Sequence, residues 1–141
     1  MQRLCLAFVA IAACGHPASP DHPAPKPTPV AGDPTCPVLV PGTSVTVEDT
    51  STGAAFVFVT TGDVAEVRKR ATALAAMHGA HDGGAMDMGM MISTTSTAAA
   101  SDIDKGARVT FTARPEDVGG LQSELRMHAQ HLAGGTCEMK M

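Results

Sequence analysis

The hydrophobic and polar positions of two segments, residues 45–59 and 98–112, follow the two-residue period of β-strands. Val45 and Val47 alternate with polar residues, and larger apolar side chains alternate again further along each segment, at Phe56, Phe58, Val109 and Phe111. The Asp-to-Gly segments 49–53 and 102–106 lie inside this pattern. They are typical of hairpin connections, because Gly accepts backbone angles that other residues resist. The pattern predicts two hairpins.

A segment with helical period follows each hairpin. The apolar face of the first helix would consist of Val64, Val67, Ala71, Leu74, Ala75 and His78, and that of the second of Val118, Leu121, Leu125, His128, Ala129 and Leu132. Thr61 or Asp63 can cap the first helix, and Pro115 suits the first turn of the second. Gly79 and Gly134-Gly135 are expected to end them. Arg68-Lys69-Arg70 is expected on the exposed face of the first helix, with Glu66 and Arg70 as an i,i+4 ion pair.

The two halves are similar to each other. When residues 45–78 are aligned with 98–132, with one gap before the helix, the hydrophobic positions coincide throughout. The third strand is expected within residues 92–101. We therefore predict an α+β fold, in which a β-β-α unit is used twice. Its four-stranded antiparallel sheet would carry two helices on one face, over a domain of residues 36–141.

Charge and aromatic content narrow the possible functions. The formal net charge is −4, and the chain has no Trp, no Tyr and only four Phe. A nucleic-acid-binding surface needs basic residues and usually aromatic platforms for the bases, so this composition argues against nucleic acid as a partner. The chain also lacks a Gly-x-Ser-x-Gly elbow, a phosphate-binding loop and a His-Glu-x-x-His helix. We expect a protein that is not an enzyme.

The N-terminus has the parts of an export signal. Arg3 precedes a short apolar run, and Ile11-Ala12-Ala13-Cys14 follows it. This tetrapeptide resembles the lipobox of bacterial lipoproteins. The resemblance implies a signal peptide over residues 1–13, cleavage before Cys14 and lipidation of Cys14, so that acyl chains anchor the protein in a membrane. Gly15, in place of Asp, favours the outer membrane facing the periplasm. The alternative is an ordinary secretory signal with a chance cysteine.

Residues 14–35 are expected to form a tether between the lipid and the domain. Seven of the ten prolines in the chain fall here, and the segment has almost no residues to bury. Such a composition favours an extended polyproline II conformation of about 3.1 Å per residue. The tether would therefore hold the domain away from the bilayer.

Two of the four cysteines flank the domain. Cys5 belongs to the signal and Cys14 to the anchor, which leaves Cys36 and Cys137 in a compartment that permits disulfides. We predict a Cys36–Cys137 disulfide that closes almost the whole domain. The alternative is a thiolate metal site formed by Cys36, Cys137 and Met139.

The segment between the two units, residues 77–91, is rich in possible metal ligands. Thioether sulfur suits Cu(I), and imidazole suits both Cu(I) and Cu(II). The alternating Met86, Met88 and Met90 look like the methionines of envelope copper-handling proteins, a resemblance that covers this loop only. The donors expected from this segment are Met86, Met88, Met90, Met91, His78 and His81. The alternative is a plain Gly-rich linker in which Met is an apolar filler.

Two further histidines extend the same hypothesis. His128 and His131 are three residues apart, a spacing that places two imidazoles on one helix face, close enough to share a metal ion. The alternative is an interior His128 and a solvated His131. The sequence thus supports two functional hypotheses: an envelope lipoprotein that binds or buffers a soft ion such as copper, and a structural lipoprotein that contacts an unknown envelope protein through its open sheet face.

Overall fold

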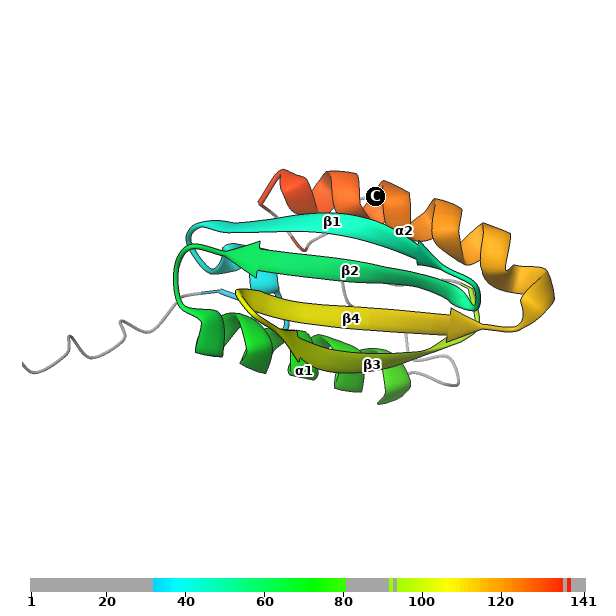
Figure 1. Ribbon diagram of the computed structural model, residues 1–141, viewed down its shortest axis with the longest axis horizontal. Coiled ribbons are helices and arrows are strands. Elements are labelled where there is room, and N and C mark those ends of the chain that lie inside the picture. Colours follow the sequence, from blue (N-terminus) through cyan, green and yellow to red (C-terminus); the bar gives the residue numbers. More distant parts are fainter. Residues whose placement is uncertain (1–31, 81–91, 93, 136, 138–141) are drawn as a thin grey trace, which may run out of the picture.

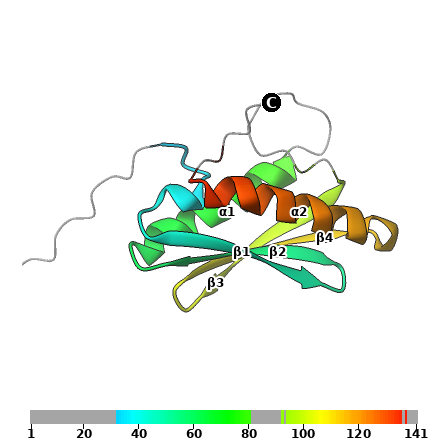
Figure 2. The ribbon, with the colours of Figure 1, turned by 90° about the horizontal axis from the view of Figure 1, so that it is seen from above.

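The computed structural model describes residues 32–80, 92, 94–135 and 137. Their elements follow the duplicated pattern: a short 3-10 helix η1 (Pro37–Leu39), strands β1 (Thr43–Thr50) and β2 (Gly53–Thr60), helix α1 (Val64–Ala80), strands β3 (Ser96–Ile103) and β4 (Gly106–Ala113), a short 3-10 helix η2 (Pro115–Asp117) and helix α2 (Val118–Ala133). All neighbouring strands are antiparallel, in the order β1-β2-β4-β3. Both helices cover the same face of this sheet (Figures 1 and 2). The predicted α+β fold is confirmed.

The repeat governs the register of the sheet. Strands β3 and β4 begin 53 residues after β1 and β2, at Ser96 and Gly106 against Thr43 and Gly53. Phe56 of the first unit corresponds to Val109 of the second, and these two residues are paired with each other in the β2–β4 ladder. A pseudo-twofold axis therefore passes through this pair at the centre of the sheet. The two units are arranged as if they were the protomers of a dimer.

Each helix covers the hairpin of the other unit. Helix α1 packs mainly on β3 and β4, and α2 packs mainly on β2 and β1 (Figure 1). Polar side chains hold each helix on the hairpin of the other unit. Arg68 of α1 donates to the carbonyl oxygens of Ile103 and Gly106, at 2.6 and 3.1 Å. Gln122 of α2 donates to those of Thr50 and Gly53, at 3.2 and 3.1 Å. Neither unit can bury its apolar face without the other.

The core lies between the helices and the sheet. The rings of Phe56 and Phe111 meet edge to face with centroids 5.5 Å apart, and Phe58 lies 6.0 Å from Phe56. The two helical stripes expected from the sequence pack on these rings, with Val67, Leu74, Leu121, Leu125 and Leu132 at most 3% exposed. Among the described residues no helix is long and apolar enough to cross a membrane.

The opposite face of the sheet carries no helix in the part of the chain that the structure describes (Figure 2). Ala55 and Val57 of β2 are nevertheless buried there. Arg108 of β4, opposite Val57, reaches across β2 and forms an ion pair with Glu48 of β1, opposite Ala55. The aliphatic part of a long Arg side chain can shield apolar surface in this way. The Glu48–Arg108 pair thus covers most of the apolar centre of this face, which Ala55 and Val57 form.

Four local predictions were wrong. The third strand runs from Ser96 to Ile103, later than 92–101, because its pairing with β4 decides where it begins. The hairpin turns are only Ser51-Thr52 and Asp104-Lys105, since both strands extend into the expected connections. Helix α1 continues past Gly79 to Ala80. Arg70 is only 2% exposed, not on the solvent face, because it lies in the same stripe as Val67 and Leu74.

The central strand pair requires glycine at both of its ends. A Cβ atom at Gly53 would lie 2.0 Å from the carbonyl oxygen of Phe111, and one at Gly106 would lie 1.9 Å from that of Phe58. These positions correspond in the two units. In contrast, a Cβ at Gly119 in α2 would meet no atom within 4 Å.

We expect Gly106→Ala to lower the free energy of unfolding by about 2 kcal/mol or more, because the new methyl group forces β2 and β4 apart. Urea unfolding followed by circular dichroism measures this change. Gly119→Ala is the matched control and should raise stability by up to about 1 kcal/mol through its helix propensity. Similar effects of the two substitutions would contradict the close approach of the strands.

Candidate functional site

The metal ligands expected from the sequence fall into two groups. Five of them lie outside the described residues, namely His81, Met86, Met88, Met90 and Met91. Three are described: His78 in the last turn of α1, and His128 and His131 in α2. Met77, beside His78, packs against the hydrophobic core. The described site is therefore built around His78, two residues before α1 ends.

His78 is held in one orientation by the start of β3. Its Nε2 atom lies 3.1 Å from the carbonyl oxygen of Ser96 and 3.0 Å from Ser96 Oγ, and its ring meets Phe111 edge to face with centroids 5.2 Å apart. A carbonyl oxygen only accepts hydrogen bonds, so this contact favours the tautomer that carries the hydrogen on Nε2. In the neutral ring the lone pair then resides on Nδ1. Metal-binding histidines commonly have this arrangement, with one nitrogen donating to a carbonyl and the other binding the ion.

The chain on the far side of the loop is also fixed by hydrogen bonds. Glu124 of α2 accepts from the backbone N–H and the hydroxyl of Thr94 through Oε2, at 3.1 and 2.8 Å. Ser96 Oγ in turn donates to the carbonyl oxygen of Thr94 at 3.1 Å. A continuous series of polar contacts therefore connects His78 to Glu124. It anchors His78 before the Met-rich segment (residues 81–91) and Thr94 and Ser96 after that segment.

The structure separates His128 from His131. His128 is 2% exposed, and its Nε2 lies 3.7 Å from Glu124 Oε1, an ion pair when the ring is protonated. His131 is exposed in the last turn of α2. One imidazole faces the interior and the other faces solvent, which does not favour a metal ion shared between them. Among the described residues, no group of three or more His, Cys, Asp or Glu side chains can hold a metal ion.

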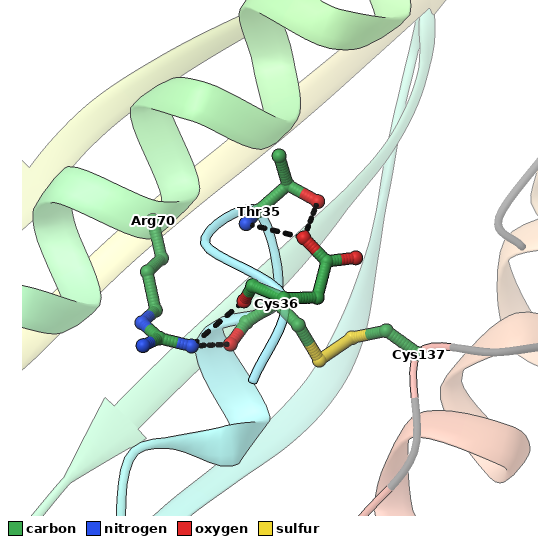
Figure 3. The surroundings of a disulfide bond; sticks show 5 residues. Thr35, Cys36, Arg70 and Cys137 are labelled. Atoms are coloured by element: carbon green, nitrogen blue, oxygen red, sulfur yellow. Dashed lines mark hydrogen bonds between the residues drawn. A yellow bond between two sulfur atoms is a disulfide. The ribbon is translucent and has the colours of Figure 1, made fainter. Parts of the chain in front are cut away.

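A second polar cluster, which the sequence did not predict, surrounds the buried guanidinium of Arg70. Its Nε donates to Glu66 Oε1 at 2.8 Å, as expected for the i,i+4 pair. Its Nη1 donates to the carbonyl oxygens of Asp33 and Cys36, at 2.8 and 3.2 Å (Figure 3). This cluster ties the segment before β1 to α1. Arg70 and Glu124 occupy corresponding positions in the two helices, and each holds the segment that enters the first strand of its own unit.

The predicted disulfide joins this segment to the end of the chain. Cys36 and Cys137 are bonded to each other, with Cα atoms 5.8 Å apart, as Figure 3 shows. Cys36 is fully buried and immediately precedes η1. The crosslink spans 101 residues, so it excludes many extended conformations of the unfolded chain.

Helical periodicity carries a signal for the burial of Arg70 and Glu124. Arg70 follows Val67 by three residues and precedes Leu74 by four, and Glu124 is placed in the same way between Leu121 and His128. Both positions border the apolar stripe, where a charged side chain needs a partner. Their partners Asp33 and Thr94 lie in segments without regular secondary structure, which the sequence pattern does not place.

The residues on which the N-terminal predictions rest, including Cys14 and the tether up to residue 31, lie outside the described residues. Comparison with known protein families, curated proteins and solved structures finds no match. The site must therefore be interpreted from its own chemistry.

The hydrogen bond from Arg70 holds the pKa of Glu66 below its ordinary value of 4.5, and the charge of Lys69 adds to this effect. Because the pKa is lower in the folded chain, the resulting stability is present above the unfolded pKa and is lost as the pH falls through the folded one. We expect the wild type to be more stable than Glu66→Gln at neutral pH and to lose this advantage below 4.5. Urea unfolding at a series of pH values measures the difference in free energy of unfolding between the two proteins. Glu116→Gln is an exposed control. A difference that does not change with pH would contradict the Glu66–Arg70 pairing.

Proposed function

We propose that the protein is a lipid-anchored protein of the bacterial envelope that binds a soft metal ion such as Cu(I). The observation that carries the proposal is the orientation of His78 beside a segment rich in methionine. Nε2 of His78 donates to the Ser96 carbonyl, which leaves Nδ1 as the lone-pair nitrogen. The ring is thus prepared to act as a ligand without a change of tautomer.

The further ligands come from the sequence that follows His78. His81, Met86, Met88, Met90 and Met91 are all within thirteen residues of it, and thioethers and imidazoles together form a donor set suited to Cu(I). Neutral donors add no negative charge, so they favour a monovalent soft ion over hard divalent ions. Such a site suits buffering or delivery of the metal. His128 and His131 stay predicted additional ligands, but not as a pair that shares one ion, because one is buried and the other exposed.

The polar contacts on both sides of the segment support this function. His78 is fixed by Ser96, and Thr94 is fixed by Glu124, so the donors are attached to a rigid sheet and helix at each end. Anchored ends reduce the conformational entropy that is lost when the ligands converge on an ion.

The proposed location rests on the lipobox at Ile11-Ala12-Ala13-Cys14 and on the proline-rich tether. The Cys36–Cys137 disulfide supports an exported protein, because such bonds persist mainly in oxidising compartments. The hypothesis of a structural lipoprotein that docks through the open sheet face has less support. The Glu48–Arg108 ion pair covers the apolar centre of that face and leaves mainly small and polar side chains for a partner.

We expect Cu(I) to bind to the full chain in competition with a chelator. Affinity should fall about tenfold or more when the sulfur donors are removed. The test variant carries Leu in place of Met86, Met88, Met90 and Met91, which keeps the apolar bulk. Met127→Leu is the matched control, since Met127 is 51% exposed and lies outside the segment. His78→Gln, which retains an N–H donor for Ser96, should also weaken binding. Unchanged affinity in the four-Leu variant, or no binding better than micromolar, would leave the structural hypothesis.

The anchor is tested by cell fractionation. We expect Cys14→Ser to remain unprocessed or to leave the membrane fraction, because the thiol that accepts the lipid is absent. Membrane association and processing identical to those of the wild type would overturn the lipoprotein proposal without bearing on metal binding.

A further inference from the structure

The Asp33–Pro34 peptide bond lies in an unusual polar environment at the start of the described domain. Its carbonyl oxygen accepts two hydrogen bonds, one from the backbone N–H of Cys36 at 3.1 Å and one from Arg70 Nη1 at 2.8 Å. Arg70 is 2% exposed, and its charge is paired with Glu66 through Nε, while Nη1 donates to the Asp33 carbonyl oxygen where water competes little. Two N–H donors already directed at this oxygen can also stabilise the negative charge that develops on it when the carbonyl carbon is attacked.

The nucleophile for such an attack belongs to the same residue. Asp33 Oδ1 accepts from the backbone N–H and the hydroxyl of Thr35, at 2.8 and 2.7 Å, so the carboxylate is held within the same turn as the bond. An aspartate carboxylate reaches its own backbone carbonyl carbon by closing a five-membered ring. Proline is the favourable residue on the other side of the bond, because its nitrogen leaves as a basic secondary amine.

We propose that the folded chain cleaves itself between Asp33 and Pro34. A carboxylate oxygen of Asp33 attacks its own carbonyl carbon, and the negative charge that develops on the carbonyl oxygen is stabilised by Arg70 and the Cys36 N–H. The bond between this carbon and Pro34 N breaks, and the nitrogen takes a proton from solvent. One water molecule then opens the cyclic anhydride to give a C-terminal Asp33 with two carboxyl groups. The sum is hydrolysis of one peptide bond, without a redox step, and a single turnover does not make the chain an enzyme.

Cleavage of the Asp33–Pro34 bond would separate the folded domain from the segment before it. The bond precedes Cys36, η1 and the whole sheet, so the product that begins at Pro34 keeps the disulfide and the Arg70–Cys36 hydrogen bond. Everything up to Asp33 separates from the domain, including Cys14. Cleavage would therefore release the folded domain from its proposed lipid anchor. The reaction itself depends on neither the anchor nor the metal, so its test is independent of both.

Intact-mass measurement of the purified full chain tests the proposal. The folded protein is incubated in neutral and mildly acidic buffer, and a parallel sample at the same pH is unfolded in urea with its disulfide reduced. We expect a fragment that begins at Pro34 to form about tenfold faster or more in the folded sample. Asp–Pro bonds are labile to acid in any chain, so equal rates in the two samples, or no fragment from the folded protein, would overturn the proposal.

Substitutions identify the groups that act. Asp33→Asn and Pro34→Ala, both at exposed positions, should abolish the fragment. Arg70→Met should reduce the folded rate to that of the unfolded chain. Arg68→Met is its matched control, since Arg68 also donates to backbone carbonyl oxygens from α1 but at Ile103 and Gly106. Should Arg70→Met fail to fold, the Asp33 and Pro34 variants together with the unfolded sample decide the outcome. Cleavage that persists at the wild-type rate in Asp33→Asn would contradict the mechanism.

Discussion

The antiparallel pairing of β2 with β4 is the constraint on which the rest of the structure depends. The two β-β-α units meet along this ladder, with Phe56 and Val109 on the pseudo-twofold axis. Gly53 and Gly106 allow the two backbones to approach at the ends of the ladder, where any side chain would strike a carbonyl oxygen. Once these strands pair, each helix lies over the hairpin of the other unit, and the three core phenylalanines come together between them. The fold is therefore an intramolecular dimer, whose units stabilise each other.

The same symmetry places the two polar clusters at the ends of the helices' partner segments. Corresponding positions of the two helices hold Arg70 and Glu124, and both bind the segment that leads into a first strand. The units have diverged in what these residues do. Arg70 holds the segment next to the disulfide through the carbonyl oxygens of Asp33 and Cys36. Glu124 fastens Thr94 and, through Ser96, the histidine at the start of the Met-rich segment. A duplicated scaffold has thus produced two different chemical environments.

The sequence was sufficient for the fold class because both units obey simple periodicities. The alternation at Phe56 and Phe58 and the helical stripes at Leu74 and Leu125 predicted the right layers, and two cysteines at the domain ends predicted the disulfide. The start of β3 was misplaced, because its Ala and Ser residues carry little hydrophobic pattern and only the register with β4 decides it. The burial of Arg70 was missed because it depends on carbonyl oxygens 34 and 37 residues away. Long-range partners of this kind leave no local pattern. The tautomer of His78 likewise follows from a contact with Ser96, 18 residues along the chain.

Native-state hydrogen exchange measures whether the two units unfold as one structure. If the two units form one cooperative structure around the β2–β4 ladder, the slowest amides should lie in both of these strands, and they should open with the same free energy. Phe56 and Val109, at the centre of the ladder, are the reference positions. Protected amides in β2 together with rapidly exchanging amides in β4, or the reverse, would mean that one unit opens alone, and this result would contradict the account.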